Sequence, residues 1–361
     1  MPTADTSAAV LDDVDVTVIG AGQAGLSVAH HLQRRGIDGP RLRVVDAEDG
    51  PGGAWRHRWP TLTVAALNGI FELPEQRQRA VAASDAASAA VPAWFAEYER
   101  DQGFQVLRPV EVDAVRQLED PHDDRLAVTA SIGRWRTRAV VSCTGTWRRP
   151  FWPTVPGMAT FTGRQLHTHD YPGPAPFAGQ RVAVVGGGVS GAGHVIELAE
   201  VAETRWITRR PPDWRRDDFK AEHGRAVIER VQARVRDGRR SRSVVAETGL
   251  ADRGRFGEAR RSGVLAHHPM FARLGPDGPV WEDGTRWPAD AIVWATGFRP
   301  EIDHLAPLRL RTQHGGIRVE GSLALDDHRV HLVGYGPSAS TVGANRYGRD
   351  AAIALSRWIN S

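Results

Sequence analysis

The chain has 361 residues, of which 41% are hydrophobic and 25% charged, and these ordinary values predict a globular protein of about two domains. The net charge of +3 reflects a local arginine excess over residues 205–261, which does not indicate nucleic-acid binding because no aromatic stacking motif accompanies it. No apolar run reaches the length of a membrane span, and a single cysteine, Cys143, excludes an intrachain disulfide and a dithiol redox centre. We therefore expect a cytoplasmic protein with neither a nucleic acid nor a membrane as its partner.

The first predicted unit follows residues 1–13, which we expect to be a disordered lead-in without the pattern of a signal peptide. An apolar strand over residues 14–19 runs into GAGQAG and then into a helical pattern, and a second strand over residues 42–45 ends in an acid. In such a unit the glycines permit a tight turn, approach of a pyrophosphate and close packing of helix on strand, while the acid binds a ribose. The expected dinucleotide contacts are Gly20, Ala21, Gly22, Gly25 and Asp46.

The chain then continues through a glycine-rich loop, a helix and three strands. The loop over residues 50–56 offers close backbone approach beside a flat apolar side chain, so Gly53 and Trp55 are expected to contact the cofactor. A helix is predicted over residues 92–101, and strands are predicted over residues 110–118, 126–132 and 135–142. Further cofactor contacts are expected at Val112, Thr144 and Gly145. The prolines that follow indicate a crossing to a second domain.

A second nucleotide-binding signature follows that crossing. A strand over residues 181–185 leads into GGGVSG and a helix over residues 192–201, and the next strand, residues 204–208, ends in two arginines. An arginine in place of the acid suits the 2′-phosphate of NADPH, although a basic strand end without a ligand is the plainer alternative. The expected contacts here are Gly186, Gly188, Val189, Ser190, Gly191, Arg209 and Arg210.

The remaining chain has one segment with a weak helical pattern, followed by a strand that ends like the last strand of the first half. Valines and an isoleucine over residues 227–235 indicate one amphipathic helix in a region otherwise rich in glycine and arginine. The strand that ends in Thr296 and Gly297 repeats the Thr-Gly ending of the first half, so these two residues are also expected to contact a cofactor. Two halves with a glycine-rich opening and a Thr-Gly close predict two dinucleotide-binding domains. A strand at residues 330–333 and a helix over residues 341–358 complete the pattern.

At this point the sequence resembles the flavin-containing monooxygenases and the related Baeyer–Villiger monooxygenases. The resemblance covers about residues 14–355 and rests on five motifs in order. The most specific is a linker fingerprint, because paired glycine motifs alone also occur in disulfide reductases. The matching residues are Gly20, Gly22, Gly25 of the first motif, Gly52, Gly53, Trp55, Arg56 of the second, Phe161, Gly163, His167, Tyr171 of the linker, Gly186, Gly188, Ser190, Gly191 of the fourth, and Ala295 to Phe298 of the last.

The resemblance implies an α/β fold with two Rossmann-like domains, each with a small β-meander, in which an NADPH-binding domain is inserted into a FAD-binding domain. We expect residues 14–160 and 300–361 to bind FAD and residues 161–299 to bind NADPH. In the family NADPH reduces FAD, and reduced FAD captures O2 as a C4a-(hydro)peroxide that oxidises a small-molecule substrate. The leading hypothesis is oxidation of a nitrogen or sulfur centre.

The resemblance also suggests roles for four side chains. His167 and Asp170 on the linker are expected to position the nicotinamide half of NADPH and to transmit domain closure, or, in the plainer alternative, His167 only caps a turn. Arg56 is expected to hold a flavin or cofactor oxygen. The family's asparagine after the second motif is not at its usual place, and Asn68 is the nearest amide.

Several alternatives stay open. Baeyer–Villiger oxidation of a ketone, an NADPH-dependent flavin reductase without oxygen insertion, and a nucleotide-binding sensor without turnover are each compatible with two intact glycine motifs. No ligand spacing indicates a metal site, and His267 and His268 are interpreted as part of a loop. The oligomeric state is not specified by the sequence, and a homodimer is one option.

Overall fold

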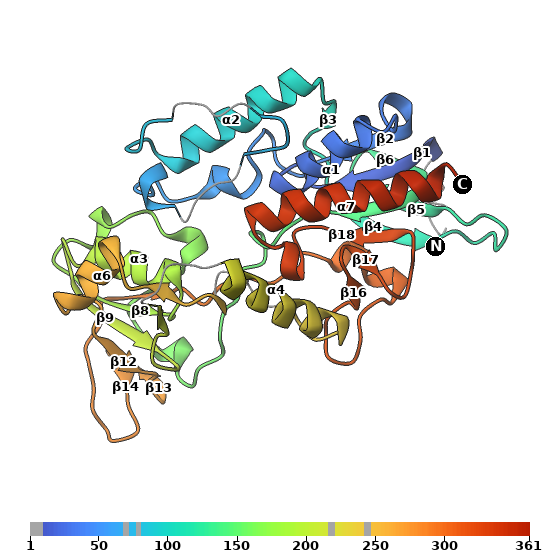
Figure 1. The fold of residues 1–361 in the computed structure, drawn as a ribbon. Coiled ribbons are helices and arrows are strands. Elements are labelled where there is room, and N and C mark those ends of the chain that lie inside the picture. Colours follow the sequence, from blue (N-terminus) through green and yellow to red (C-terminus); the bar gives the residue numbers. More distant parts are fainter. Residues whose placement is uncertain (1–9, 68–71, 77–80, 216–220, 242–246) are drawn as a thin grey trace.

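The computed structural model describes residues 10–67, 72–76, 81–215, 221–241 and 247–361, and these form two α/β domains (Figure 1). The first domain is built from both ends of the chain, and the second is built from its middle. This arrangement confirms the predicted class, with one Rossmann-like domain inserted into another.

A nine-stranded sheet forms the centre of the first domain. Its strands are β1 (Val10–Ile19), β2 (Leu42–Val45), β3 (Val106–Leu107), β4 (Val112–Gln117), β5 (Leu126–Ala130), β6 (Gly133–Ser142), β16 (Val319–Glu320), β17 (Leu323–Ala324) and β18 (Val330–Leu332). Strands β18, β6, β1, β2 and β3 are neighbours in this order and run parallel. Because both faces of a parallel sheet are covered, β1 is apolar and buried at Val14, Val16 and Val18.

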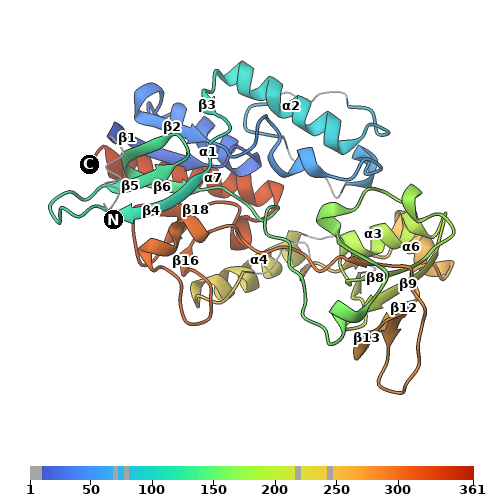
Figure 2. The ribbon, with the colours of Figure 1, turned by 180° about the vertical axis from the view of Figure 1, so that it is seen from behind.

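Helices α1 (Gln23–Gln33) and α7 (Thr341–Ile359) lie side by side over this sheet, as both views show (Figures 1 and 2). Their crossing is close because α7 presents a glycine: a Cβ on Gly348 would lie 2.7 Å from Ser27 Oγ. Helix α2 (Ala87–Gln102) begins five residues before the predicted start at residue 92. The alanines before Pro92 favour a helix strongly enough to place the proline inside it.

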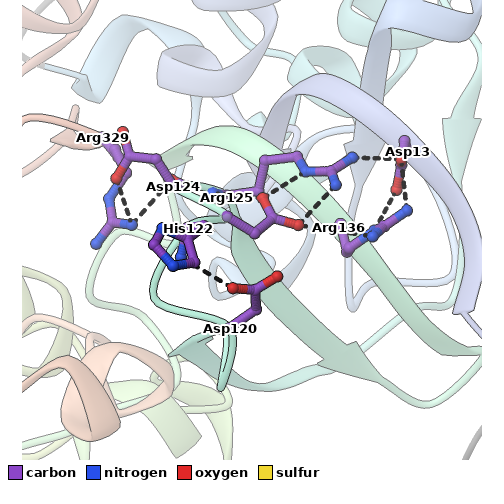
Figure 3. A network of polar contacts seen from close by, with 8 residues as sticks. Asp13, Asp120, His122, Asp124, Arg125, Arg136 and Arg329 are labelled. Carbon is purple, nitrogen blue, oxygen red and sulfur yellow. Dashed lines mark hydrogen bonds and ion pairs between the residues drawn. The ribbon is translucent and has the colours of Figure 1, made fainter.

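Strand β1 begins at Val10, so the predicted lead-in of 13 residues is too long. The extra residues pair with β6, where Val10 lies opposite Arg134. The predicted meander is β4–β5–β6, which is antiparallel throughout. Arginines and aspartates connect this meander to its neighbours (Figure 3). Arg125 in the β4–β5 turn and Arg136 in β6 both bond Asp13 in β1. Arg329, just before β18, bonds Asp124 in the β4–β5 turn at 3.2 Å.

The second domain has a five-stranded parallel sheet in the order β12-β9-β8-β15-β7. Its strands and helices are β7 (Arg164–His167), β8 (Arg181–Val185), α3 (Val189–Leu198), β9 (Glu203–Thr208), α6 (Gly254–Arg261), β12 (His267–Pro269) and β15 (Ala291–Trp294). Two short pairs complete it: β10 (Trp214–Arg215) with β11 (Leu250–Ala251), and β13 (Arg273–Gly275) with β14 (Gly278–Val280). Where a small meander was predicted for this domain, the structure has only the two-stranded antiparallel β13–β14 hairpin.

Two of the connections between the domains run side by side, and we call them the first and the second crossing. Residues 149–151 lie antiparallel to residues 297–299: the Phe151 N–H donates to Gly297 O at 2.9 Å, and the Arg299 N–H donates to Arg149 O at 2.8 Å. A paired connection restrains the two domains more than two separate loops would.

Helix α4 (Ala221–Arg236) falls within residues 161–299, which were predicted to form the NADPH-binding domain, but it does not belong to that domain. Although it lies in the middle of the sequence, it packs against the first domain, below α7 in Figure 1 and away from α3 and α6. Val235 is fully buried in the core of the first domain, and Gln232 Nε2 donates to Val319 O at 2.8 Å. The amphipathic helix itself was predicted correctly, and only its domain was wrong.

Candidate functional site

The first glycine turn joins β1 to α1, and two of its glycines are required by the packing of the chain itself. Gly20 has φ +98°, and a Cβ there would lie 2.7 Å from Cys143 O. A Cβ on Gly25 would lie 1.8 Å from Gly20 O, so α1 approaches the end of β1 only because Gly25 has no side chain. These two glycines bring the start of α1 to the carboxyl edge of the sheet.

The middle glycine of this turn differs from the other two. Gly22 has an ordinary φ of −79°, and the nearest atom to a Cβ there would be Gly53 Cα at 4.0 Å. Neither backbone geometry nor packing within the described chain requires a glycine at this position. The open space before the first turn of α1 is where a phosphate would meet backbone N–H groups. Gly53, predicted from the second motif, lies directly over Gly22.

Asp46 lies at the end of β2, beside the glycine turn. Its carboxylate accepts hydrogen bonds from the Ala21 and Glu48 N–H groups and is 6% exposed. Burial raises the pKa of Asp46, while the two backbone hydrogen bonds act in the opposite direction. The Val110 N–H donates to Asp46 O, which places Val112 at the start of β4 near the same edge. The structure thus brings together the residues predicted for the first site.

The second glycine turn joins β8 to α3 and repeats the packing of the first. A Cβ on Gly186 would lie 2.1 Å from Ala295 O, and a Cβ on Gly191 would lie 2.1 Å from Gly186 O. A Cβ on Gly188 would meet no atom within 4 Å. Val189 and Ser190 form the first turn of α3, next to this open space.

Arg209 and Arg210 follow β9 and are both exposed, as a phosphate contact requires. A third arginine, Arg299, lies near Arg209 after the second crossing. Burial lowers the pKa of Arg299, and the positive charges of Arg240 and Arg209 lower it further. Positive charge therefore gathers beside the open space of the second turn.

The two Thr-Gly pairs hold the domain crossings. Thr144 follows β6 and its hydroxyl donates to Glu301 O, whereas Thr296 follows β15 and its hydroxyl donates to Phe151 O at 2.5 Å. Each threonine therefore bonds the opposite crossing. Gly145 O accepts from the Glu301 N–H, and Gly297 O accepts from the Phe151 N–H. The hydroxyls predicted to contact a cofactor are already used to fix the connection between the domains.

His167, predicted as a catalytic residue, uses both ring nitrogens for contacts within the chain. It ends β7, is fully buried, and bonds through both ring nitrogens: Nε2 lies 3.0 Å from Gly297 O, and Nδ1 accepts from the His169 N–H at 3.1 Å. Burial lowers the pKa of His167 to about 4, so the ring is neutral. It therefore caps a turn, as the plainer alternative held, and it also ties β7 to the second crossing.

The other three predicted catalytic residues are placed less centrally. Arg56 pairs with Asp49 and donates to Pro51 O at 3.3 Å, so it braces the loop in which it lies. Asp170 is exposed and bonds the neighbouring His169 at 2.7 Å. Asn68 lies outside the described residues. Trp55 lies in the 3₁₀ turn η2 (Gly53–His57) against the core of the first domain.

A contact between the domains was not predicted. Trp59 Nε1 and Thr61 Oγ1 donate to the two carboxylate oxygens of Glu197 on α3, at 3.2 and 3.0 Å. The Trp59 ring lies 4.6 Å from the His194 ring, also on α3. Burial raises the pKa of Glu197. The only sequence signal was that this segment follows the second motif.

The described residues contain no group of three or more His, Cys, Asp or Glu side chains arranged to hold a metal ion. None of their helices is both long and apolar enough to cross a membrane.

Comparison with known proteins places this geometry in a family. A family model described as pyridine nucleotide-disulphide oxidoreductase matches residues 17–249. A solved structure of a double mutant of the flavin monooxygenase from Stenotrophomonas maltophilia matches with a TM-score of 0.82 and 39% identity, and covers 96% of this chain and 99% of that chain.

Curated relatives match over shorter stretches. An uncharacterised CzcO-like oxidoreductase from Geobacillus kaustophilus is 28% identical over 190 residues, which are 53% of each chain. A Baeyer–Villiger monooxygenase from Streptomyces coelicolor is 26% identical over 210 residues, 57% of this chain and 39% of that protein. The chain thus spans about half or less of the length of these two relatives.

Proposed function

The chain belongs to the pyridine nucleotide-disulphide oxidoreductase family and to the flavin-containing monooxygenases, and from this premise we propose that it is a monooxygenase that uses FAD and NADPH. Its substrate is a small molecule that is oxidised by O2 at a nitrogen or sulfur centre. The observation that carries the proposal is the pair of glycine turns, each with an open position at its middle glycine.

The residues present fit the two cofactors. A Cβ on Gly22 would have only Gly53 Cα beside it, at 4.0 Å, and one on Gly188 would meet no atom within 4 Å, so at both turns the missing side chain would leave room for an external group. Glycine N–H groups and the first turns of α1 and α3 would hold the two pyrophosphates. Asp46 would bind the ribose of FAD, and Arg209 with Arg210 the 2′-phosphate of NADPH. Bound FAD would supply the redox chemistry that activates O2.

The chain's own residues orient the groups and exclude water. Thr144, Thr296 and His167 fix the paired crossings, which set the distance between the two sites. Trp147 stacks on Phe298 with ring centroids 4.9 Å apart and thereby covers the junction from both domains. Excluding water from such a site protects a reactive intermediate from side reactions.

The choice of a nitrogen or sulfur centre rests on three side chains that hold the connection between the domains. Thr144, Thr296 and His167 use their polar atoms for structure, and His167 is neutral, so none of them is free to act as acid or base. An amine or thioether is itself a nucleophile and needs no base to react with an electrophilic oxygen. A ketone would benefit from a group that polarises its carbonyl.

Product analysis under ¹⁸O2 tests the proposal. Purified protein with FAD and NADPH is incubated with a thioether, a tertiary amine and a cyclic ketone, and each product is weighed by mass spectrometry. We expect one labelled oxygen atom in a sulfoxide or an N-oxide. A labelled lactone would instead establish Baeyer–Villiger oxidation. NADPH consumption that reduces an added electron acceptor, with no label in any product, would establish a reductase.

A further inference from the structure

Arg58, which follows the η2 turn, carries a charge that the described chain does not neutralise. Its guanidinium carbon lies 4.3 Å from the centroid of the Trp147 ring and 5.3 Å from that of Trp55. Its Nε is buried without a hydrogen-bond partner, and among the described residues no carboxylate or carbonyl accepts from its terminal nitrogens. The side chain as a whole is only partly buried, so its terminal nitrogens are the part that remains accessible.

The position of Arg58 places those nitrogens at the junction of the domains. Trp147 stacks on Phe298 of the second domain at 4.9 Å and lies 5.1 Å from the His169 ring. Trp55 belongs to the loop that covers the first glycine turn. The guanidinium is therefore held between the loop of one site and the aromatic contact that joins both domains.

Electrostatics supports the geometry. Burial lowers the pKa of Arg58 to about 10, and no nearby charge contributes to this shift. The group nevertheless stays charged at neutral pH, because its pKa remains well above 7. A cation that is partly removed from water and has no partner destabilises a fold unless an anion compensates it. Contact with the faces of two indoles offsets part of the cost but leaves the N–H groups at the edge unused.

A second arginine provides an internal comparison. Arg205 on β9 also lies over two tryptophans, Trp281 at 5.8 Å and Trp287 at 5.0 Å. These tryptophans flank the turn at residues 283–284, beyond the β13–β14 hairpin and away from the domain crossings. The chain thus contains the same cation–aromatic arrangement at two places, and only one of them faces the junction.

We propose that Arg58, whose guanidinium lies over the rings of Trp55 and Trp147, uses its terminal N–H groups to bind an oxyanion of a small ligand at the domain junction. This oxyanion is either a phosphate or a carboxylate. The planar fork of a guanidinium matches both groups, and either would bring the negative charge that the surroundings lack. A phosphate would come from the nicotinamide dinucleotide, and a carboxylate from a substrate. The inference rests on the proposed function only in placing a ligand at this junction.

Binding measurements on the FAD-loaded protein test this without turnover. Arg58→Met keeps an apolar stem but removes the charge, Arg58→Lys keeps the charge without the fork, and Arg205→Met is the matched control. Calorimetric titrations use NADP⁺, inorganic pyrophosphate and benzoate as probes. We expect Arg58→Met to weaken at least one probe about tenfold or more, Arg58→Lys to weaken it less, and Arg205→Met to leave all three unchanged.

The pattern among the probes identifies the ligand. Weaker binding of NADP⁺ and pyrophosphate alone assigns the site to the dinucleotide, and weaker binding of benzoate alone assigns it to a carboxylate substrate. Unchanged affinities in Arg58→Met for all three probes would overturn the proposal, as would a loss of FAD from Arg58→Met, since Arg58 would then serve the flavin. Thermal unfolding of the variants checks folding, and Arg58→Lys provides the test if Arg58→Met does not fold. Because no oxygenation is measured, failure of this proposal and failure of the proposed function are distinguishable.

Discussion

The two glycine turns are alike in packing and differ in their surroundings. In both turns, a Cβ on the first or third glycine would lie 1.8 to 2.7 Å from a backbone atom, so only glycine fits there. The middle glycine is not restricted in this way. The first turn is covered by Gly53 and faces the buried carboxylate of Asp46. The second is open, with exposed arginines beside it. A turn with a neighbouring loop over it suits a resident cofactor, and an uncovered turn suits a cofactor that exchanges in each turnover, so we propose FAD for the first and NADPH for the second.

The strongest way to break this assignment is to block each turn separately. Gly22→Val places a branched side chain in the open space of the first turn, and we expect folded protein that has lost FAD almost completely. Gly188→Val should keep FAD and weaken NADPH binding about a hundredfold or more, since the phosphate site is filled. Flavin absorbance after desalting and NADP⁺ titration measure the two effects. Stoichiometric FAD in folded Gly22→Val would refute the assignment of the first site.

The next prediction concerns the two arginines that follow β9 in the second site, where the first site has Asp46. Replacing Arg209 and Arg210 together by alanine removes charge-assisted contacts worth roughly 1.5–3 kcal/mol, so the KM for NADPH should rise about ten- to a hundredfold. The KM for NADH should hardly change. Steady-state kinetics with both cofactors measure this. Equal losses with NADPH and NADH would show that the arginines do not read the 2′-phosphate.

A smaller effect is expected from a substitution of His167, which bonds the second crossing between the domains. His167→Ala removes the bonds to Gly297 and to the His169 N–H, which loosens the second crossing. We expect FAD to remain bound and the share of NADPH that yields hydrogen peroxide instead of product to rise a few-fold. A peroxide assay beside product analysis measures this share, and His267→Ala is an exposed control. Unchanged coupling would remove His167 from the positioning role.

The smallest effect concerns acid stability. Burial lowers the pKa of His304 from 6.5 to about 4, and its Nε2 lies 3.1 Å from Ser142 Oγ. As pH falls, the unfolded chain takes up a proton on this residue before the folded one does, so stability is intact above about pH 6.5 and declines towards pH 4. His304 alone should cost about 1 kcal/mol at pH 5.5. Urea unfolding at pH 7.5 and 5.5 should show a smaller loss in His304→Gln than in wild type.

The comparison also shows what the sequence can specify. Local patterns predicted the glycine turns, the strand at residues 181–185 and the helix from Thr341, because periodicity and turn chemistry act within a few residues. These local patterns could not predict contacts between segments that are far apart in the sequence. The pattern did not reveal that α4 joins the first domain, that His267 and His268 form a strand instead of a loop, or that Glu197 binds Trp59.

The roles of site residues were harder to predict than their positions. Thr144, Thr296 and His167 do lie at strand ends beside the expected sites, as their motifs suggested. Their polar atoms nevertheless bond the crossings, and such pairing depends on residues more than 100 positions away. Arg58 was visible in the sequence, but the proposal that it binds a ligand rests on its two indole neighbours and its unpaired Nε, which only the structure shows.

The most direct test of the account is whether the two sites retain their ligands differently. Protein saturated with FAD and NADP⁺ is desalted, and the nucleotides that remain bound are released and quantified by chromatography. The account predicts that nearly every chain retains FAD and almost none retains NADP⁺, and that anaerobic addition of NADPH to the desalted protein then bleaches the flavin absorbance. Retention of NADP⁺ with loss of FAD, or flavin that NADPH fails to bleach, would contradict it.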